Sequence, residues 1–438
     1  MSQYTPINWP PPPLGDWPSN RAALTYVREQ LREAERNPTP FHDVIKDFKK
    51  LVDEDPALKV LSEKMFQEIP IVEGDVTFEA KNFNDALKVC NAILTSPPYV
   101  RTSGADISAI TVPFNAVFNW PAATTSGYAF FLNPEVNGKL KNMINKWGEF
   151  LSGPDSTKYL ASDIPHDEEG KYWFSDGYQQ RMKEYGQWIG KNIEDLYDCN
   201  PHLSTWGFNS WDAFFTRSFR EDVRALSKDD RDNEKLIVNP CEAGYQNLSL
   251  RVNDRDTFWL KAQPHSMLNM LNFDSNSYKF FNGTVYQGWL SSACYHRWHA
   301  PISGTVTKIV QVPGTYYSNV RSNLYPSPDP SGPNLSQNYL SSVATRALIF
   351  IEADNKDIGL VCFIAIGMNE ISSCEVTVKM GQHVTKGHEL GMFHMGGSAF
   401  CLVFEHRAKL QFEREPDKTD DNPHQMFKLN SPLAHVQN

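Results

Sequence analysis

The spacing of apolar residues changes partway along the chain, and this change limits the possible folds more than any other feature. Up to about residue 204, apolar side chains recur three and four positions apart between charged ones, as in amphipathic helices. From about Trp206, short runs rich in Val, Ile, Phe and Thr alternate with Gly, Pro and Asn, which is typical of antiparallel strands. The sequence therefore predicts an α+β protein. We expect a Pro-rich lead at 1–18, a mostly helical domain at 19–204 and an antiparallel β-rich domain at 205–438.

Individual stripes and runs place the elements more closely. Helices are predicted over Ala23–Leu31, Val44–Val52, Leu61–Phe66, Leu140–Leu151 and Asp176–Leu196. Strands are predicted over Gly304–Val312, Ala347–Glu352, Leu360–Ile366 and Glu375–Lys379. The segment Arg321–Leu340 is too rich in Pro, Ser and Asn to form a regular element. A loop of this length in a β domain is either disordered or a functional lid.

Charge and composition exclude several classes of protein. Lys and Arg total 42 against 52 acidic residues, a net charge of −10, so nucleic acid and anionic membranes are poor partners. The longest apolar stretch, Leu360–Met368, is far shorter than the ~20 residues of a membrane-spanning helix. The N-terminus lacks the basic leader and apolar core of a signal peptide, and no membrane anchor is expected. The seven cysteines are scattered without a C-x-x-C pair, which predicts reduced thiols in a cytoplasmic protein.

Two segments of the β domain carry the residues best suited to chemistry. One is YHRWHAPISG at Tyr295–Gly304, and the other is a glycine-punctuated hairpin that ends in Gly396-Gly397-Ser398. His296 and His299 have no third ligand at a suitable spacing and would point to opposite faces of a strand, so no metal site is predicted. The G-x-S-x-G elbow of hydrolases and the phosphate-binding P-loop are both absent. By its spacing alone, Gly-Gly-Ser is also compatible with an ordinary turn.

A serine that follows glycine can also cut its own chain. Its hydroxyl attacks the carbonyl of the preceding peptide bond, and an N-to-O acyl shift gives an ester. β-Elimination then breaks the chain and leaves dehydroalanine, which hydrolyses to a pyruvoyl group and ammonia. The attack needs a strained backbone, which a residue without Cβ permits. It also needs a base, for which histidine is suited near neutral pH.

The two segments together resemble the pyruvoyl-dependent phosphatidylserine decarboxylase family. The shared pattern is Y-H-R-x-H-x-P-x-x-G followed far downstream by K-G-x-E-L-G-x-F-x-x-G-G-S. Further matches are Phe214, Phe215 and Arg217 in DAFFTRSFREDVR and the run Val312-Pro313-Gly314, so the resemblance covers about 205–438.

The resemblance implies cleavage between Gly397 and Ser398, with Ser398 as the precursor of a covalent pyruvoyl cofactor. It implies that His299 acts with a carboxylate in self-cleavage and that His296 assists decarboxylation. In the family that carboxylate is an aspartate in a P-A-D-G stretch, but the matching stretch here contains Glu242, which is one methylene longer. Ala399 also replaces the threonine that usually follows the serine.

The departures, the added helical region and the missing anchor resemble a fungal branch of the family, the soluble aromatic L-amino acid (tryptophan) decarboxylases. That resemblance implies a carbon–carbon lyase that decarboxylates aromatic L-amino acids, most simply L-tryptophan to tryptamine, through a Schiff base with the pyruvoyl group. The working protein would be residues 1–397 bound to their own cleaved chain, 398–438. Phosphatidylserine decarboxylation, which makes phosphatidylethanolamine, is the main alternative.

Two other interpretations are weaker. Pyridoxal phosphate is not expected, because Lys386 lies in a glycine-bounded hairpin and not in a phosphate-binding cup. The segments APISGTVTKIV and VKMGQHVTKGHELG resemble the hairpins of biotinyl or lipoyl carriers. A carrier would have no use for Tyr295–His299 or Gly396–Ser398.

Overall fold

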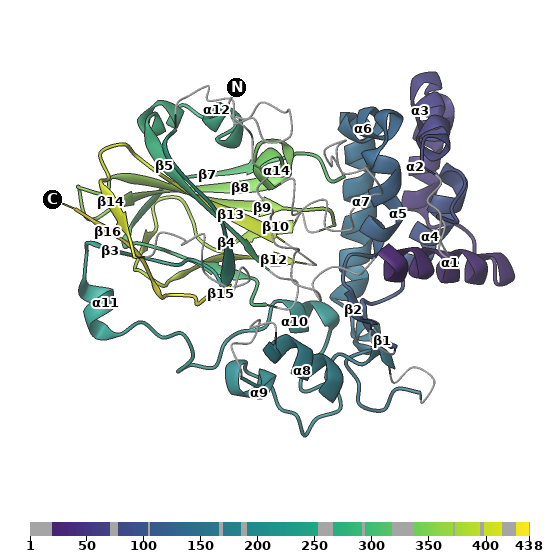
Figure 1. The fold of residues 1–438 in the computed structure, drawn as a ribbon, viewed down its shortest axis with the longest axis horizontal. Coiled ribbons are helices and arrows are strands. Elements are labelled where there is room, and N and C mark those ends of the chain that lie inside the picture. Colours follow the sequence, from purple (N-terminus) through teal and green to yellow (C-terminus); the bar gives the residue numbers. More distant parts are fainter. Residues whose placement is uncertain are drawn as a thin grey trace, which may run out of the picture.

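The α+β architecture predicted from the sequence is confirmed. The computed structural model describes residues 20–70, 78–103, 106–165, 170–184, 191–252, 266–290, 294–317, 337–370, 373–394, 398–413 and 426–437. Helices α1 to α7 stand together on one side of the molecule, and the large sheet with its covering elements forms the other side (Figure 1). The Pro-rich lead at 1–18 lies outside the described residues.

The helices begin and end at residues that suit those positions. Asp55 and Asn133, for example, accept hydrogen bonds from the first backbone N–H groups of α3 and α7, and each is followed by proline at the first helical position. The helices are α1 (Asn20–Arg36), α2 (Asp43–Glu54), α3 (Pro56–Gln67), α4 (Phe83–Ile93), α5 (Pro113–Ala123), α6 (Thr125–Leu132), α7 (Pro134–Leu151), α8 (Asp176–Glu184), α9 (Ile193–Leu196), α10 (Trp211–Phe215), α11 (Lys228–Asp232), α12 (Met267–Met270) and α14 (Gln337–Val343), with 3-10 turns η1 (Pro154–Thr157) and η3 (Ser277–Phe280).

The strands of the described residues form four antiparallel sheets. Their orders are β1-β2, β10-β12-β6, β14-β16-β3 and β11-β7-β8-β9-β13-β5-β4-β15. The strands are β1 (Tyr99–Ser103), β2 (Asp106–Ile110), β3 (Leu236–Val238), β4 (Ala243–Val252), β5 (Gly283–Leu290), β6 (Arg297–His299), β7 (Gly304–Val312), β8 (Arg346–Ala353), β9 (Leu360–Gly367), β10 (Ser373–Val376), β11 (His383–Val384), β12 (Glu389–His394), β13 (Ser398–Phe404), β14 (Leu410–Phe412), β15 (Met426–Phe427) and β16 (Pro432–Val436).

The eight-stranded sheet is buried on both faces, which explains why β9 and β13 are continuously apolar. Successive side chains point to opposite faces of a strand, so Phe363 and Phe400 enter one core while Ile364 and Cys401 enter another. Trp298 of β6 belongs to the core that contains Phe363 and Phe400. The core that contains Ile364 and Cys401 is closed by α12 and α14. β13 lies in the middle of this sheet and is hydrogen-bonded to β9 and β5 along its whole length.

A third core fills the helical part and is unusually rich in aromatic side chains. It extends beyond α1 to α7, because Trp206, Phe208, Trp211 and Phe214 also belong to it. The spacing of apolar residues changes at these positions, yet the first strand that follows is β3 at Leu236. The aromatic content near Trp206 reflects packing in the helical core, and the prediction of strands directly from this point was wrong.

Two further predictions of element bounds were wrong, and one hairpin was missed. No single helix spans Asp176–Leu196, because Lys191 and Asn192 are not helical and the Asn192 N–H bonds the Asp195 carboxylate at the start of α9. The strand predicted at Glu375–Lys379 ends at Val376, because Lys379 enters a turn in which its N–H bonds the side chain of Gln382. The hairpin β1-β2 lies in the region predicted to be helical.

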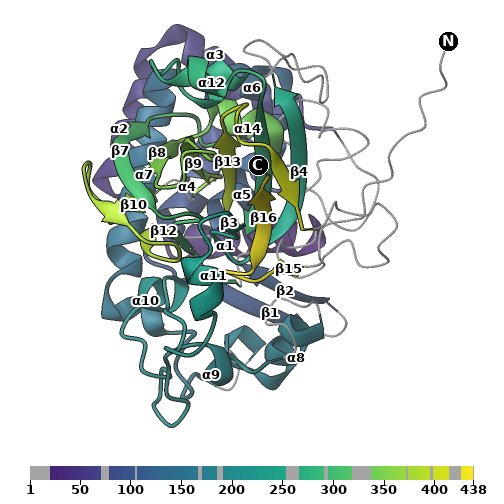
Figure 2. The same cartoon turned by 90° about the vertical axis from the view of Figure 1, so that its left-hand side faces the viewer.

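The predicted loop Arg321–Leu340 falls mostly outside the described residues, but its last four residues form the start of α14. Viewed from the side, the helical region lies behind the sheet, and β13 runs near the centre of the molecule (Figure 2). In the part of the chain that the structure describes, no helix is long and apolar enough to cross a bilayer.

Candidate active site

β6 ends at His299 and directly follows His296, so both motif histidines lie beside the strand that leads to the Gly-Gly-Ser junction. β6 pairs with β12, and the backbone N–H of Phe393 in β12 donates to the carbonyl of His296 at 3.0 Å. Side chains leave a strand alternately, and the contacts of the two histidines accordingly differ. His296 stacks on Phe215, whereas His299 contacts Tyr295 and the backbone of Gly387.

His299 is held as a neutral imidazole with a defined tautomer. Its Nδ1 lies 2.8 Å from the carbonyl oxygen of Gly387, and because a carbonyl only accepts, Nδ1 carries the proton. Its Nε2 then accepts from the hydroxyl of Tyr295 at 2.9 Å. Burial lowers the pKa of His299, although the bond to Gly387 partly opposes this. A neutral imidazole is the form that a general base requires, and here its Nε2 lone pair is engaged by the Tyr295 hydroxyl.

His296 lies in an apolar setting. It is fully buried, and its ring stacks on Phe215 with 3.8 Å between ring centroids. Burial lowers its pKa well below the usual range, and the charge of Arg217 lowers it further, while backbone groups of Cys294 and Phe215 oppose the shift. Neither ring nitrogen makes a well-aligned side-chain hydrogen bond to another described residue. His296 is therefore kept uncharged by its apolar surroundings.

Arg217 explains why the F-F-x-R segment accompanies the histidine motif. Its guanidinium donates to the carbonyls of Phe214 and Cys294, and it lies 4.1 Å above the ring of Tyr197. It thus ties the residue two before His296 to the helix α10 that carries Phe215. The F-F-x-R segment, which lies about 80 residues earlier in the chain, thus packs around His296.

Glu242 does not contact His299. Its Oε1 pairs with Nε of Arg224 at 2.5 Å, and its Oε2 accepts from the backbone N–H of Leu429 at 2.8 Å. Both ring nitrogens of His299 have other partners. The backbone N–H of His299 does donate to the carbonyl of Pro240, two residues before Glu242. Burial raises the pKa of Glu242, and Arg224 opposes that shift. The carboxylate instead links the body of the protein to its last strands.

The junction itself is anchored on its C-terminal side. Ser398 is the first residue of β13 and pairs in register with Leu290 of β5 and Gly367 of β9. Gly397 lies outside the described residues. The backbone on the Ser398 side is therefore fixed by two neighbouring strands.

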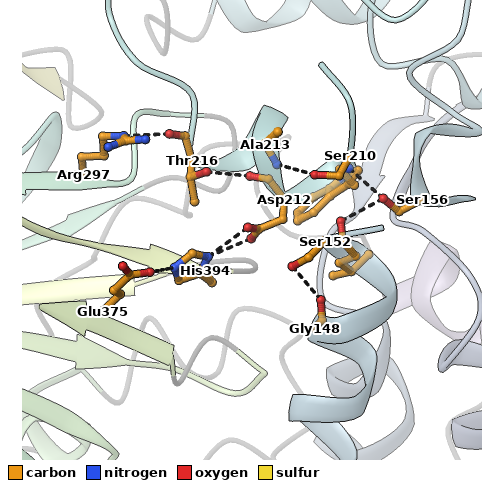
Figure 3. Close-up of polar contacts among 12 residues, drawn as sticks. Gly148, Ser152, Ser156, Ser210, Asp212, Ala213, Thr216, Arg297, Glu375 and His394 are labelled. Atoms are coloured by element: carbon orange, nitrogen blue, oxygen red, sulfur yellow. Dashed lines mark hydrogen bonds and ion pairs between the residues drawn. The ribbon is translucent and has the colours of Figure 1, made fainter. Parts of the chain in front are cut away.

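A cluster of three ionisable residues lies at the end of β12. His394 is its last residue, and its two ring nitrogens contact the carboxylates of Asp212 in α10 and Glu375 in β10 (Figure 3). The sequence motifs assign no role to these residues. They are separated by up to 182 positions, and only the proximity of His394 and Asp212 to the two recognised motifs pointed to them.

A second buried carboxyl group lies just beyond β9. Glu370 is fully buried, and its oxygens accept from the backbone N–H of Asn115 in α5 at 3.0 Å and from the hydroxyl of Tyr317 at 3.1 Å. Burial raises the pKa of Glu370 to about 7, whereas the hydrogen bonds that it accepts oppose this shift. Glu370 follows Gly367, the partner of Ser398, by three residues, so it lies at the same end of the sheet as the junction.

Comparison with known proteins identifies the family of the chain. Family models described as phosphatidylserine decarboxylase match residues 42–182 and 211–422, and the second match contains both motif histidines and Ser398. The chain belongs to the phosphatidylserine decarboxylase family, which confirms the resemblance found in the sequence.

Within that family, the chain is similar to fungal enzymes. Decarboxylase iboD of Amanita muscaria is 42% identical over 74% of this chain and 91% of the relative. L-tryptophan decarboxylase of Psilocybe cubensis is 35% identical over 82% of this chain and 79% of the relative. Phosphatidylserine decarboxylase proenzyme 2 of Oryza sativa is 27% identical over 64% of this chain and 38% of the relative. The predicted closeness to the fungal tryptophan decarboxylases is thus confirmed.

Proposed function

We propose that this protein decarboxylates aromatic L-amino acids, with L-tryptophan converted to tryptamine, by means of a pyruvoyl group that it makes from Ser398. The observation that carries the proposal is the pairing of β6 with β12, because it sets His299 in β6, and His296 directly before β6, against the strand that leads to the junction. The choice of substrate rests on the greater similarity to L-tryptophan decarboxylases than to phosphatidylserine decarboxylases. The relatives named proenzymes support cleavage.

The residues of the chain fit a pyruvoyl group at position 398. Cleavage would make Ser398 a new chain end, and β5 and β9 would keep that end in place. When present, the group supplies a carbonyl that takes up the substrate amine and withdraws the electron pair left by CO2. No bound cofactor such as pyridoxal phosphate is then needed.

Each histidine has a proposed task. His299 would take the proton of the Ser398 hydroxyl, and the hydroxyl of Tyr295, which occupies Nε2, would either relay this proton or move aside. His296 would return a proton to the α-carbon, for which a neutral imidazole retains one N–H. We assign Glu242 to anchoring residues 398–438 and not to cleavage, because its oxygens bind Arg224 and Leu429.

A denaturing gel tests the cofactor assignment. The purified protein should appear as two chains of 397 and 41 residues, the smaller with a blocked N-terminus. Ser398→Ala should leave one uncut, inactive chain. Ser152→Ala is a matched control, because that hydroxyl donates to the carbonyl of Gly148 in the last turn of α7, and it should cut normally. An uncut wild type, or a Ser398→Ala variant that still decarboxylates, would refute the proposal.

A substrate panel tests the reaction. Release of CO2 would be measured from tryptophan, phenylalanine, tyrosine and vesicles containing phosphatidylserine. We expect turnover of tryptophan and none of the lipid. Turnover of the lipid alone would show that the chain is a phosphatidylserine decarboxylase despite its similarity to the fungal enzymes. Turnover of none of the four would overturn the substrate assignment but leave the gel result intact.

A further inference from the structure

The end of β12 is fixed by an ion pair with two carboxylates. Nδ1 of His394 lies 2.9 Å and 3.1 Å from the two carboxylate oxygens of Asp212, and its Nε2 lies 2.8 Å from a carboxylate oxygen of Glu375 (Figure 3). An ionised carboxylate only accepts hydrogen bonds, so both ring nitrogens must donate. His394 is therefore an imidazolium between two acids. Burial alone would lower its pKa, but the hydrogen bonds and charges of Asp212 and Glu375 raise it.

Asp212 occupies a rigid position. Its helix α10 is capped by Ser210, whose hydroxyl accepts from the Ala213 N–H at 3.0 Å. The Trp211 N–H also donates to the hydroxyl of Ser156 at 2.8 Å. Figure 3 shows how these contacts join α10 to the end of α7 and to η1. Asp212 therefore presents a fixed carboxylate to His394.

The same short helix carries the ring that packs on His296. Phe215 stacks on His296, and three residues earlier Asp212 binds His394. Thr216, the next residue, accepts a hydrogen bond from Nε of Arg297 in β6 at 2.8 Å. The helix α10 and the residue after it thus contact both β12, which leads to the junction, and β6, which ends at His299.

The sequence between the anchored points explains why such an ion pair is useful. Only Met395, Gly396 and Gly397 separate His394 from Ser398, and glycine has the greatest backbone freedom of any residue. Attack on the Gly397 carbonyl requires one conformation of this segment, so freedom at either end slows the reaction. The pairing of β13 fixes the Ser398 end. At the opposite end, His394 lies in register with Ser373 of β10, and the contacts of its side chain with Asp212 and Glu375 add a second anchor.

We propose that His394 is a positioning residue for self-cleavage, which holds the Gly397–Ser398 bond in its reactive conformation through hydrogen bonds to Asp212 and Glu375. This inference rests on the proposed function, because it concerns the same cleavage. His394 does not touch the reacting atoms. It acts by fixing the N-terminal flank of the segment that reacts.

If this is correct, the rate of cleavage should fall on both sides of an optimum pH. Above the raised pKa of His394, the ring loses a proton and can no longer donate to both acids, so cleavage slows. Below the lowered pKa of His299, the proposed base is protonated, so cleavage slows again. The charged groups facing His394 are Asp212 from α10 and Glu375 from β10, and the adjoining strand β6 contributes Arg297, which pairs with Glu389.

The test follows cleavage of newly made full-length chain. The protein is pulse-labelled in cell-free synthesis and chased at several pH values from about 5.5 to 8.5, and release of the 41-residue chain is timed on a gel. His394→Gln should cleave about tenfold more slowly near the optimum and lose the fall at high pH. His394→Arg, which keeps its charge at every pH, should also lack that fall. His383→Gln removes an exposed His–Asp pair in β11 and should cleave like wild type.

Glu375→Gln guards against a folding defect, because the side chain of Glu375 is 54% exposed and its loss should not disturb the core. It should shift the fall at high pH toward lower pH. Wild-type rates and pH profiles for both His394→Gln and Glu375→Gln would overturn the inference. If Ser398→Ala also blocked cleavage in that experiment, the proposed function would stand without it. Cleavage of Ser398→Ala would instead remove the proposed function itself.

Discussion

Glu370 should make the protein less stable as pH rises through the neutral range, and Glu370→Gln should remove this effect. The carboxyl group has an ordinary pKa of 4.5 and a pKa of about 7 in the folded protein. Between these values the folded state holds a proton that the unfolded state has released. The contribution of Glu370 to stability is therefore highest below pH 4.5, falls as pH rises, and reaches its lower value just above pH 7. A difference of 2.5 pKa units corresponds to about 3 kcal/mol.

Glutamine keeps the shape of the side chain. Its amide oxygen can still accept from the Asn115 N–H, and its NH2 group can donate to the hydroxyl of Tyr317. The free energy of unfolding would be measured by urea denaturation from pH 4.5 to 7.5, in the Ser398→Ala background so that a single covalent chain unfolds. The stability of the variant relative to its parent should rise by about 3 kcal/mol over this range.

Glu63→Gln, at an exposed position of α3, is the matched control and should show no such trend. A difference between Glu370→Gln and its parent that stays constant with pH would show that Glu370 is ionised in the folded protein. The effect of burial on the pKa of Glu370 would then not outweigh that of its hydrogen bonds.

Two further substitutions test how the site is supported. Arg224→Ala should lower the free energy of unfolding by about 3 kcal/mol, because it leaves the carboxylate of Glu242 buried without its cation. Adding Glu242→Gln should recover part of this loss, and equal losses in the single and double variants would contradict the ion pair. Neither variant should prevent cleavage on a gel, because Glu242 is assigned to anchoring. Gly391→Ala would place a Cβ 2.1 Å from the Glu375 carbonyl oxygen and 2.4 Å from the buried ring of Trp298, and should cost about 1–3 kcal/mol by denaturation. Gly138→Ala, which meets no atom within 4 Å in α7, should instead be neutral or slightly stabilising, and a similar loss in both glycine variants would refute the steric argument.

The parts of the fold that the sequence predicted were those in which a local pattern decides the structure. The stripe of α7 and the runs of β7, β8 and β9 are set by which face each residue buries, and this information lies within each segment. The hairpin β1-β2 and the break at Asn192 were missed, because short elements carry little periodic signal and a single hydrogen bond can interrupt a helix.

The candidate site divides in the same way. Ser398, His296 and His299 stand in dense motifs, so they could be identified one by one. The partners of these residues could not. The spacing of residues gave no sign that Glu242 reaches Arg224 and Leu429, because these contacts depend on how distant segments pack. Asp212 and His394 meet across 182 positions, and a match to the family motif includes neither as a reacting group.

The position of β13 also determines what kind of stability a cut protein can have. Before cleavage, the chain can unfold and refold as one molecule. Once it is cut at Gly397–Ser398 as proposed, a strand from the middle of the eight-stranded sheet belongs to a separate 41-residue chain. Regaining the fold would then require two molecules to meet and one to thread between β5 and β9. Maturation would thus make folding a single event, and the lifetime of the enzyme would depend on its rate of unfolding.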